Sequence, residues 1–169
     1  SATGTAPTGF KDPIDLGAET KESIKGADAV DGKYKVASTV ATLASGAALH
    51  GSALEINGKT YIMKDSAQDL DPSIDTSKVT VVEYNAANAT DYTKNDNASV
   101  ALAQAVNKAE TDIQAKVEAD GKITFSETEA YGNKVYAGKA ESIDFASIIK
   151  PSSMKIGGSG ANKEITITD

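Results

Sequence analysis

His50 is the only histidine in this chain of 169 residues, and it is the side chain best suited to acid–base chemistry. A histidine acts as a catalytic base beside a nucleophile and an orienting carboxylate, and it binds a metal together with further ligands. The chain has no cysteine, so thiolate nucleophiles, disulfides and zinc–sulfur sites are excluded. Because no motif supplies partners for His50, we expect it to be a surface or turn residue without a catalytic role.

The acidic stretch DSAQDLDPSIDTSK, residues 65–78, is a second candidate, because calcium binds several carboxylate oxygens at once. Its candidate oxygen ligands are Asp69, Asp71, Ser73 and Asp75. Their spacing departs from the EF-hand pattern, since Ile74 stands where a glycine is needed and Thr80 where the bidentate glutamate belongs. We therefore expect a solvated acidic loop and no metal site.

Three further patterns are also better explained without chemistry. The segment GGSG, residues 157–160, leads into a predicted strand, so no helix N-terminus is available to bind a phosphate. Asn88-Ala89-Thr90 and Asn97-Ala98-Ser99 match the N-glycosylation pattern, which is common by chance. Glycoside cleavage needs two acids across a cleft, and none of the 24 acidic residues is singled out as such a pair. We expect no enzyme activity and no catalytic, cofactor-binding or metal-binding residues.

The composition restricts the partners that the chain can bind. Its formal net charge is −7, which opposes binding to nucleic acids and to anionic membranes. All 17 basic residues are lysines, so the bidentate guanidinium groups that recognise phosphate are absent. The longest apolar run, residues 40–49, is too short to span a bilayer. Aromatic residues make up only 5% of the chain, which predicts a thin core of alanine, valine, isoleucine and leucine.

A β-hairpin over residues 53–64, ALEINGKTYIMK, is the clearest predicted element. Asn57-Gly58 tolerates positive φ at both central positions of a type I′ turn, and this two-residue turn places Leu54 opposite Tyr61. The register then gives an apolar face of Leu54, Ile56, Tyr61 and Met63 and a polar face of Glu55, Thr60 and Lys64. Turn and hydrophobic pattern agree, so a half-buried hairpin is expected.

A helix over residues 98–112 and a second hairpin over 114–127 follow. Asn97 is a suitable helix N-cap. The apolar stripe of this helix consists of Leu102, Val106, Ala109 and Ile113. In the hairpin, a three-residue loop of Ala119, Asp120 and Gly121 pairs Val117 with Ile123 and Ala115 with Phe125. We expect Gly121 to adopt the left-handed conformation of a G1 bulge.

The other segments give weaker signals. Residues 1–9 are expected to be a linker, and residues 18–25 to form a short helix in a polar region with turns at Asp12-Pro13 and Asp31-Gly32. Strands are expected at 33–38, at 78–85 in the centre of the sheet, and at 163–169; residues 40–49 are ambiguous. Gly132-Asn133 is expected to form a turn, and a strand or short helix over 142–150 to end at Pro151. The order of elements predicts an α+β fold, a mostly antiparallel β-sheet with hairpins and one covering helix.

The order of these elements resembles a repeat of bacterial flagellins, the "flagellin hook IN" motif of their outer, variable region. In that motif a strand ends in an Ile-Asn-Gly turn, a helix ends near Ala-Ile-Asn, and a strand then reaches an Asp-Gly turn before a Leu-Thr-Leu strand. The matching residues are Ile56-Asn57-Gly58, Ala105-Val106-Asn107, Asp120-Gly121 and Ile123-Thr124-Phe125. The resemblance covers about residues 51–140. The insert at 65–97 is longer than the motif implies, and the long terminal helices of flagellins are not in the sequence.

The resemblance implies a surface-exposed variable domain of a flagellin, residues 10–169, that serves motility without catalysis. This domain is either one unit or two subdomains, 10–50 with 141–169 and 51–140. Because the chain begins at Ser1 and not at methionine, we expect it to be a processed product or an excised part of a larger protein. The implied localisation is secreted, on the extracellular surface of the bacterial flagellum.

The partners implied by the resemblance are neighbouring flagellin subunits, contacted through the missing terminal regions, and host antibodies or receptors. The alternative hypothesis is a secreted adhesin-type module that binds a glycan or a host protein through a concave site with clustered aromatic or acidic residues. The isolated domain is expected to be a monomer, with lysines protecting the strand edges from pairing with other copies. The lysines expected at these edges are Lys59, Lys64, Lys116 and Lys122.

Overall fold

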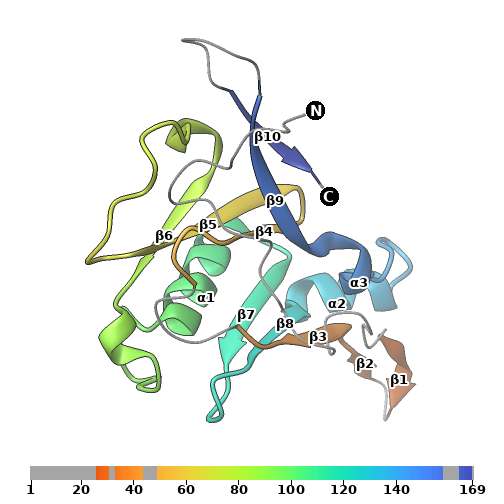
Figure 1. The fold of residues 1–169 in the computed structure, drawn as a ribbon. Helices are drawn as coiled ribbons and strands as arrows, with labels where there is room; N and C mark the ends of the chain where they lie inside the picture. Colours follow the sequence, from red (N-terminus) through yellow and green to blue (C-terminus); the bar gives the residue numbers. More distant parts are fainter. Residues whose placement is uncertain (1–25, 31–32, 44–48, 158–163, 169) are drawn as a thin grey trace.

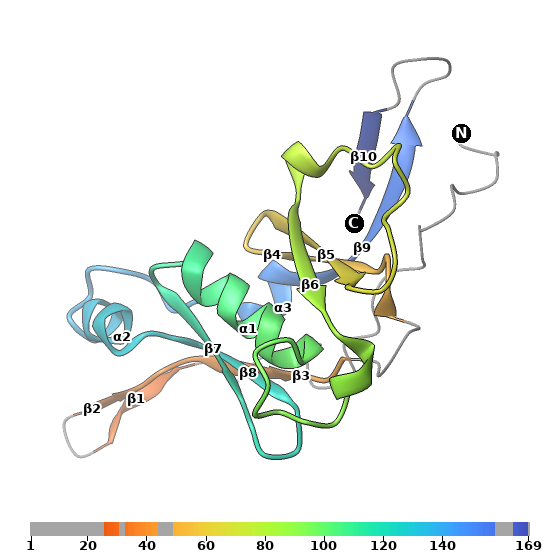
Figure 2. The ribbon, with the colours of Figure 1, turned by 90° about the vertical axis from the view of Figure 1, so that its left-hand side faces the viewer.

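The computed structural model describes residues 26–30, 33–43, 49–157 and 164–168 (Figures 1 and 2). The strands are β1 (Ala27–Val30), β2 (Lys33–Lys35), β3 (Ser38–Ala41), β4 (Ala53–Ile56), β5 (Lys59–Asp65), β6 (Thr80–Tyr84), β7 (Ile113–Val117), β8 (Ile123–Glu127), β9 (Ile149–Gly157) and β10 (Glu164–Thr168). The helices are α1 (Ala98–Ala109), α2 (Glu129–Tyr136) and α3 (Phe145–Ile148), with 3-10 turns η3 (Thr76–Lys78) and η4 (Ala86–Asn88). The expected linker, N-terminal helix and N-terminal turns lie outside the described residues.

The described strands form three sheets with the orders β10-β9-β4-β5-β6, β3-β8-β7 and β1-β2. Neighbouring strands are antiparallel except β5 and β6, which run parallel. Figure 2 shows α1 between the two larger sheets, so the helix packs against strands on two sides and not on one. The α+β fold class with mostly antiparallel pairing is confirmed.

The first hairpin has the predicted turn and register. Asn57 and Gly58 have φ of 51° and 79°, as a type I′ turn requires. Leu54 pairs with Tyr61, and Ile56 with Lys59. The turn is held from outside the hairpin as well, because the Asn57 backbone N–H donates to the carbonyl of Ile148 at 2.8 Å. The apolar face of this hairpin therefore consists of the expected residues, and it lies in the core.

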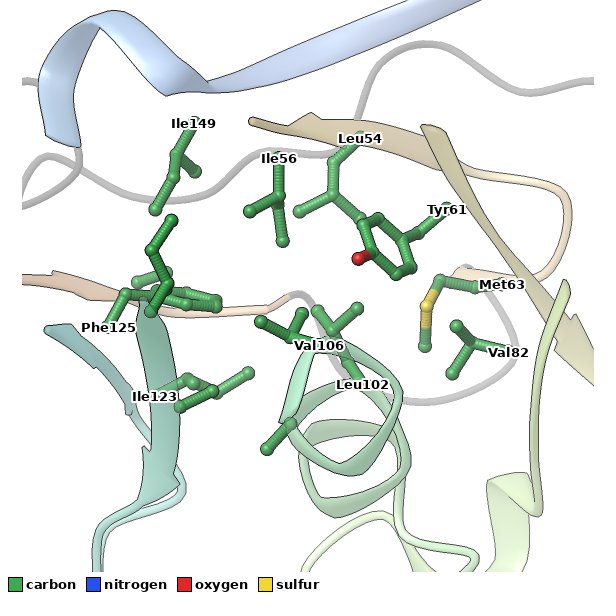
Figure 3. Packing of buried hydrophobic residues seen from close by; sticks show 14 of the residues in the cluster. Leu54, Ile56, Tyr61, Met63, Val82, Leu102, Val106, Ile123, Phe125 and Ile149 are labelled. Carbon is green, nitrogen blue, oxygen red and sulfur yellow. The ribbon is translucent and has the colours of Figure 1, made fainter. Parts of the chain in front are cut away.

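The main core lies where α1 separates the two larger sheets (Figure 3). Leu102 and Val106 of α1 are fully buried between the apolar face of the five-stranded sheet on one side and Ile123 and Phe125 of β8 on the other. Burial of one such side chain stabilises the fold by about 1.5–3 kcal/mol relative to exposure. The core residues of the five-stranded sheet are Leu54, Ile56, Tyr61, Met63, Val82, Tyr84 and Ile149.

Helix α1 begins as predicted but ends earlier. The Asn97 side chain accepts hydrogen bonds from the backbone N–H groups of Ser99 and Val100. The helix ends at Ala109, which is exposed, and Ile113 belongs to β7, so the predicted stripe is wrong in its second half. The chain turns there because the Asn107 side chain donates to the Ala115 carbonyl (2.9 Å) and accepts from its N–H (2.8 Å), which holds β7 beside the helix.

The second hairpin also has the predicted loop. Val117 pairs with Ile123, and Ala115 with Phe125. The backbone N–H of Gly121 donates to the Glu118 carbonyl at 2.9 Å, and Gly121 has φ of +86°. The glycine is needed for space as well as for φ, since a Cβ atom there would lie 2.2 Å from the ring of Tyr92.

One expectation about the 65–85 region is wrong, and another is incomplete. Strand β6 lies at the edge of the described sheet and not at its centre, with Val81 36% exposed. Loop 66–79 is acidic and most of its residues are exposed, as expected, but its apolar residues also cover the outer face of β4 and β5. The small cluster that it forms there consists of Ala53, Ile62 and Ile74 with Leu70 and Val79. Val79, the residue before β6, packs against this cluster, whereas Val81 of β6 is exposed.

Three further expectations fail, two of them at residues that usually interrupt secondary structure. Gly132 and Asn133 lie within α2 and form no turn, because the missing Cβ of Gly132 lets the helix approach Val36 closely. Pro151 lies within β9; β10 pairs with β9 only from Ser153 onward, so the proline has one strand neighbour among the described residues. The strand predicted over 33–38 is divided between β2 and β3.

Of the four lysines expected at strand edges, Lys116 is exposed on β7, one of the two edge strands of the β3-β8-β7 sheet. Lys64 lies on β5 between two strands, and its Nζ is 3.6 Å from Glu83 of β6. Lys59 forms an ion pair with Glu110, and Lys122 follows the second hairpin turn. The proposed edge protection therefore applies to Lys116.

Candidate functional site

His50 is a turn residue, but it is buried, with only 4% of its surface exposed. Its Nδ1 accepts a hydrogen bond from the Asp65 backbone N–H at 3.0 Å, so the proton is on Nε2. Nε2 lies 3.1 Å from the carbonyl oxygen of Asp69 and donates to it. Both ring nitrogens are therefore occupied by backbone groups, and the imidazole joins β5 to loop 66–79. The ring acts as a structural connector between these two segments.

The carboxylates of the acidic loop bind their own backbone. Asp71 accepts from the N–H of Ser73, and Asp75 from the N–H of Ser77, each within a short turn. Asp69, the remaining candidate ligand, contributes its carbonyl to His50. Within the residues that the structure describes, no three His, Cys, Asp or Glu side chains are placed to hold a metal ion together.

Hydrogen bonds of this kind also change the titration of three aspartates. The Ala67 backbone N–H holds the pKa of Asp65 below its ordinary value, although burial opposes this shift. The hydroxyl and then the backbone N–H of Ser77 lower the pKa of Asp75, and those of Thr93 lower the pKa of Asp91 in the same way. These carboxylates are stabilised in the charged form by turns.

The two N-glycosylation patterns differ in accessibility. Asn97 is 1% exposed, and its amide group donates to the carbonyls of Asn88 and Ala89 while capping α1. It cannot accept a glycan while the protein is folded. Asn88 is half-buried, and its amide group donates to Asp96 at 2.8 Å. Of the GGSG segment, Gly157 ends β9, and residues 158–160 lie outside the described ranges.

Glu127 is a buried acidic residue that no motif in the sequence indicated. Its side chain is fully buried, and its carboxylate accepts from the backbone N–H groups of Ala37 (2.8 Å) and Ile143 (2.9 Å). Its burial follows from the strand pattern, because alternate residues of a strand share a face and Glu127 therefore lies on the same inward face of β8 as Ile123 and Phe125. The carboxylate fixes the loop before α3 against β3 and β8.

A groove of about 350 Å³ lies over that loop. Its lining includes Asp112, Tyr131, Glu141, Asp144 and the isoleucines Ile113, Ile143 and Ile148. The loop wall is held in place, since the Tyr131 hydroxyl donates to the Glu141 carbonyl (2.6 Å) and the Tyr34 hydroxyl to Ser142 Oγ (3.0 Å). Burial, followed by the charges of Glu127, Asp112 and Glu141, raises the pKa of Tyr131. The groove is thus preformed and negatively charged, with one aromatic wall.

The fold and these contacts define an α+β protein. Its candidate reactive side chains, such as those of His50, Asp75 and Glu127, form hydrogen bonds that hold turns and loops. None of the described helices combines the length and the apolar composition needed to cross a membrane. Comparisons with protein-family models, with curated proteins and with solved structures found no match for the chain.

Proposed function

We propose that this chain is the surface-exposed variable domain of a bacterial flagellin, a structural part of the flagellar filament that carries out no catalysis. The observation that carries the proposal is the hairpin–helix–hairpin unit of β4, β5, α1, β7 and β8. In this unit, three of the four short motifs on which the flagellin resemblance depends contain a residue that fixes the geometry of the chain, and the fourth, Ile123-Thr124-Phe125, supplies two side chains to the core.

Those motif residues work as turn and clamp residues. Asn57-Gly58 closes the first hairpin with two positive φ angles. Asn107 binds the backbone of Ala115 and so holds α1 against β7. Gly121 closes the second hairpin under the ring of Tyr92. A repeat that preserves these residues preserves a shape, which is what a projecting filament domain requires.

The two side chains best suited to chemistry, those of His50 and Glu127, support the same conclusion. His50 and Glu127 are both buried and bind backbone groups, so neither is presented to a substrate. The net charge of −7 favours a solvated outer surface. In the proposed arrangement, contacts with neighbouring flagellin subunits come from regions of the subunit outside this domain. The outer face is then available to host antibodies or receptors.

Filament composition tests the proposal. Filaments sheared from cells of the source bacterium and purified by sedimentation should contain the peptides of this chain, in a subunit with a longer sequence on both sides. Recovery of these peptides only from the cell body or from soluble secreted protein would contradict it. For the isolated domain we propose a monomer, and a stable dimer by light scattering at micromolar concentration would contradict that part.

The groove over residues 141–144 favours one alternative, a secreted adhesin-type module that binds a glycan or a host protein. It combines Tyr131 with the carboxylates of Asp112, Glu141 and Asp144, which is the concave acidic and aromatic site that such a module needs. Calorimetry with calcium and a glycan array separate the two functions. Saturable binding that is lost in Tyr131→Ala and kept in Tyr136→Ala, an exposed tyrosine outside the groove, would favour the adhesin.

A further inference from the structure

Asn57 lies at an exposed turn that combines unusual chemical reactivity with a structural contact. Asn57 and Gly58 are both exposed at the tip of the β4–β5 hairpin, and outside residues 57–59 no described atom lies within 4 Å of the place where a Cβ of Gly58 would be. Among the eight asparagines of the chain, only Asn57 is followed by glycine. We propose that Asn57 is the principal deamidation site of this protein and that the product releases the hairpin tip from α1.

The reaction needs only the chain and water. The backbone nitrogen of Gly58 attacks Cγ of Asn57, a C–N bond forms, and the bond from Cγ to Nδ2 breaks. Nδ2 leaves as ammonia with the proton of the Gly58 N–H, which closes a five-membered succinimide ring. Water then opens the ring at one of its two carbonyls, giving aspartate or isoaspartate at position 57. No oxidant or reductant takes part.

Glycine makes position 57 more reactive than the other asparagines. The attacking nitrogen belongs to the following residue, and glycine has no Cβ to obstruct the approach or to restrict the backbone rotation that the ring requires. The asparagines at positions 85, 88, 95, 97, 107, 133 and 162 are followed by alanine, aspartate, lysine or, in the case of Asn97, the first residue of α1. Asn97 and Asn107 are also held by bonds to backbone groups.

The contact that depends on Asn57 involves the end of α1. Nδ2 of Asn57 donates to Oε1 of Glu110 at 2.8 Å, and the side chain of Glu110 is only 5% exposed. The other carboxylate oxygen of Glu110 pairs with Lys59 Nζ. Glu110, the residue that follows α1, therefore joins the hairpin tip to the end of that helix.

Deamidation breaks this contact in two ways. The product carboxylate has no proton to donate, so a second acceptor with negative charge faces Oε1 of Glu110 across hydrogen-bond distance. Isoaspartate additionally inserts a methylene group into the main chain of a two-residue turn. The register of Ile56 with Lys59 and of Leu54 with Tyr61 depends on that turn length.

Site selectivity is tested on the full chain, incubated in its folded state at mildly alkaline pH until a fraction of its asparagines has reacted. Peptide mapping by mass spectrometry locates the mass gain, and an isoaspartate-specific methyltransferase quantifies isoaspartate. Modification at Asn57 should be severalfold faster than at any other asparagine. If Asn57 stays intact while other asparagines react, the proposal is wrong.

The structural consequence is tested with Asn57→Asp, which has the aspartate product from the start. Asn133→Asp adds the same charge at an exposed position of α2 and serves as the matched control. Asn57→Asp should lower the thermal unfolding midpoint at neutral pH by several degrees more than Asn133→Asp, and Glu110→Gln should reduce this difference. Equal midpoints for the two aspartate variants, or a difference that persists unchanged with Glu110→Gln, would overturn the proposed release.

Discussion

Single polar residues in this protein often satisfy several backbone groups at once. Asn97 caps α1 with its oxygen and binds two carbonyls with its nitrogen, and Glu127 joins two segments far apart in the sequence. Buried polar groups contribute favourably only when they are paired in this way, because an unpaired one loses its hydration without compensation. The exceptions to complete pairing are therefore informative.

The hydroxyl of Tyr61 is such an exception. It is fully buried and has no hydrogen-bond partner among the described residues, as is also true of the hydroxyl of Ser152. Tyr61→Phe should leave the free energy of unfolding unchanged or raise it by up to about 1 kcal/mol, since no bond is lost. Ser152→Ala should behave similarly. Urea unfolding measures both variants, and a loss beyond experimental error for Tyr61→Phe would show that its hydroxyl is paired.

His50 should be sensitive to truncation. His50→Ala leaves the Asp65 N–H and the Asp69 carbonyl without their partner and should lower the free energy of unfolding by about 1–3 kcal/mol. His50→Asn is the matched variant, because its side-chain oxygen can accept from Asp65 near the place of Nδ1, and it should recover part of the loss. Denaturant unfolding at neutral pH makes the comparison. Full stability of His50→Ala would contradict the connector role.

The sequence predicted single residues well where the interaction is local. Asn97 and Gly121 act on neighbours within a few positions, so the cap and the bulge could be recognised from spacing alone. The partners of Glu127 are 90 and 16 positions away, and those of His50 are 15 and 19 positions away. Such contacts depend on how the strands and loops fold together, which a local pattern does not contain.

At the scale of elements, the turn residues determined which predictions succeeded. Both hairpins were predicted with the correct register, because two-residue and three-residue turns fix the pairing of the strands that follow. Helix α2 and the middle of β9 were missed, because Gly132 and Pro151 usually end such elements. The fold accommodates both residues through tertiary contacts. Gly132 allows α2 to approach Val36 closely, and Pro151 has a strand neighbour on one side only among the described residues.

The second hairpin turn allows a matched test of steric fit. Gly121 and Gly138 both have positive φ, +86° and +73°, but only at Gly121 would a Cβ meet another side chain, Tyr92. Each alanine substitution should cost about 1–2 kcal/mol for the left-handed backbone. Gly121→Ala should cost more, because the Tyr92 ring must also move. Chemical unfolding of the two variants checks this, and equal losses would mean that Tyr92 gives way freely.

At the scale of the whole molecule, titrating groups define the pH range of greatest stability. The folded-state pKa values of Asp65, Asp75 and Asp91 lie below the ordinary value of 3.8. Their contribution is therefore complete above that pH and is lost as the pH falls through the lower folded values. Burial raises the pKa of Tyr61 and of Tyr84 from 10.0 to about 12, so their contribution is lost as the pH rises between these values.

Unfolding free energies measured across pH test this expectation. The curve should fall at acid pH below 3.8 and at alkaline pH between 10 and about 12, and Tyr61→Phe should weaken the alkaline fall. Stability that rises between pH 10 and 12 would contradict the assigned direction of the tyrosine shifts.

The two expected subdomains, residues 10–50 with 141–169 and residues 51–140, both contribute strands to each of the larger sheets, since β3 pairs with β8 and β9 pairs with β4. The division into two subdomains stays a prediction. The arrangement of two sheets around α1 was itself beyond the sequence, which indicated a helix covering one sheet. A narrow stripe on an amphipathic helix does not reveal how many sheets it contacts.

The proposal that this domain forms the outer surface of a flagellar filament is tested most directly by Fab fragments raised against the folded chain. Electron microscopy of intact filaments from the source bacterium should show Fab fragments along the whole filament, and none on filaments from which the domain has been deleted. Filaments that remain bare, with Fab fragments bound only to the cell body, would contradict the account.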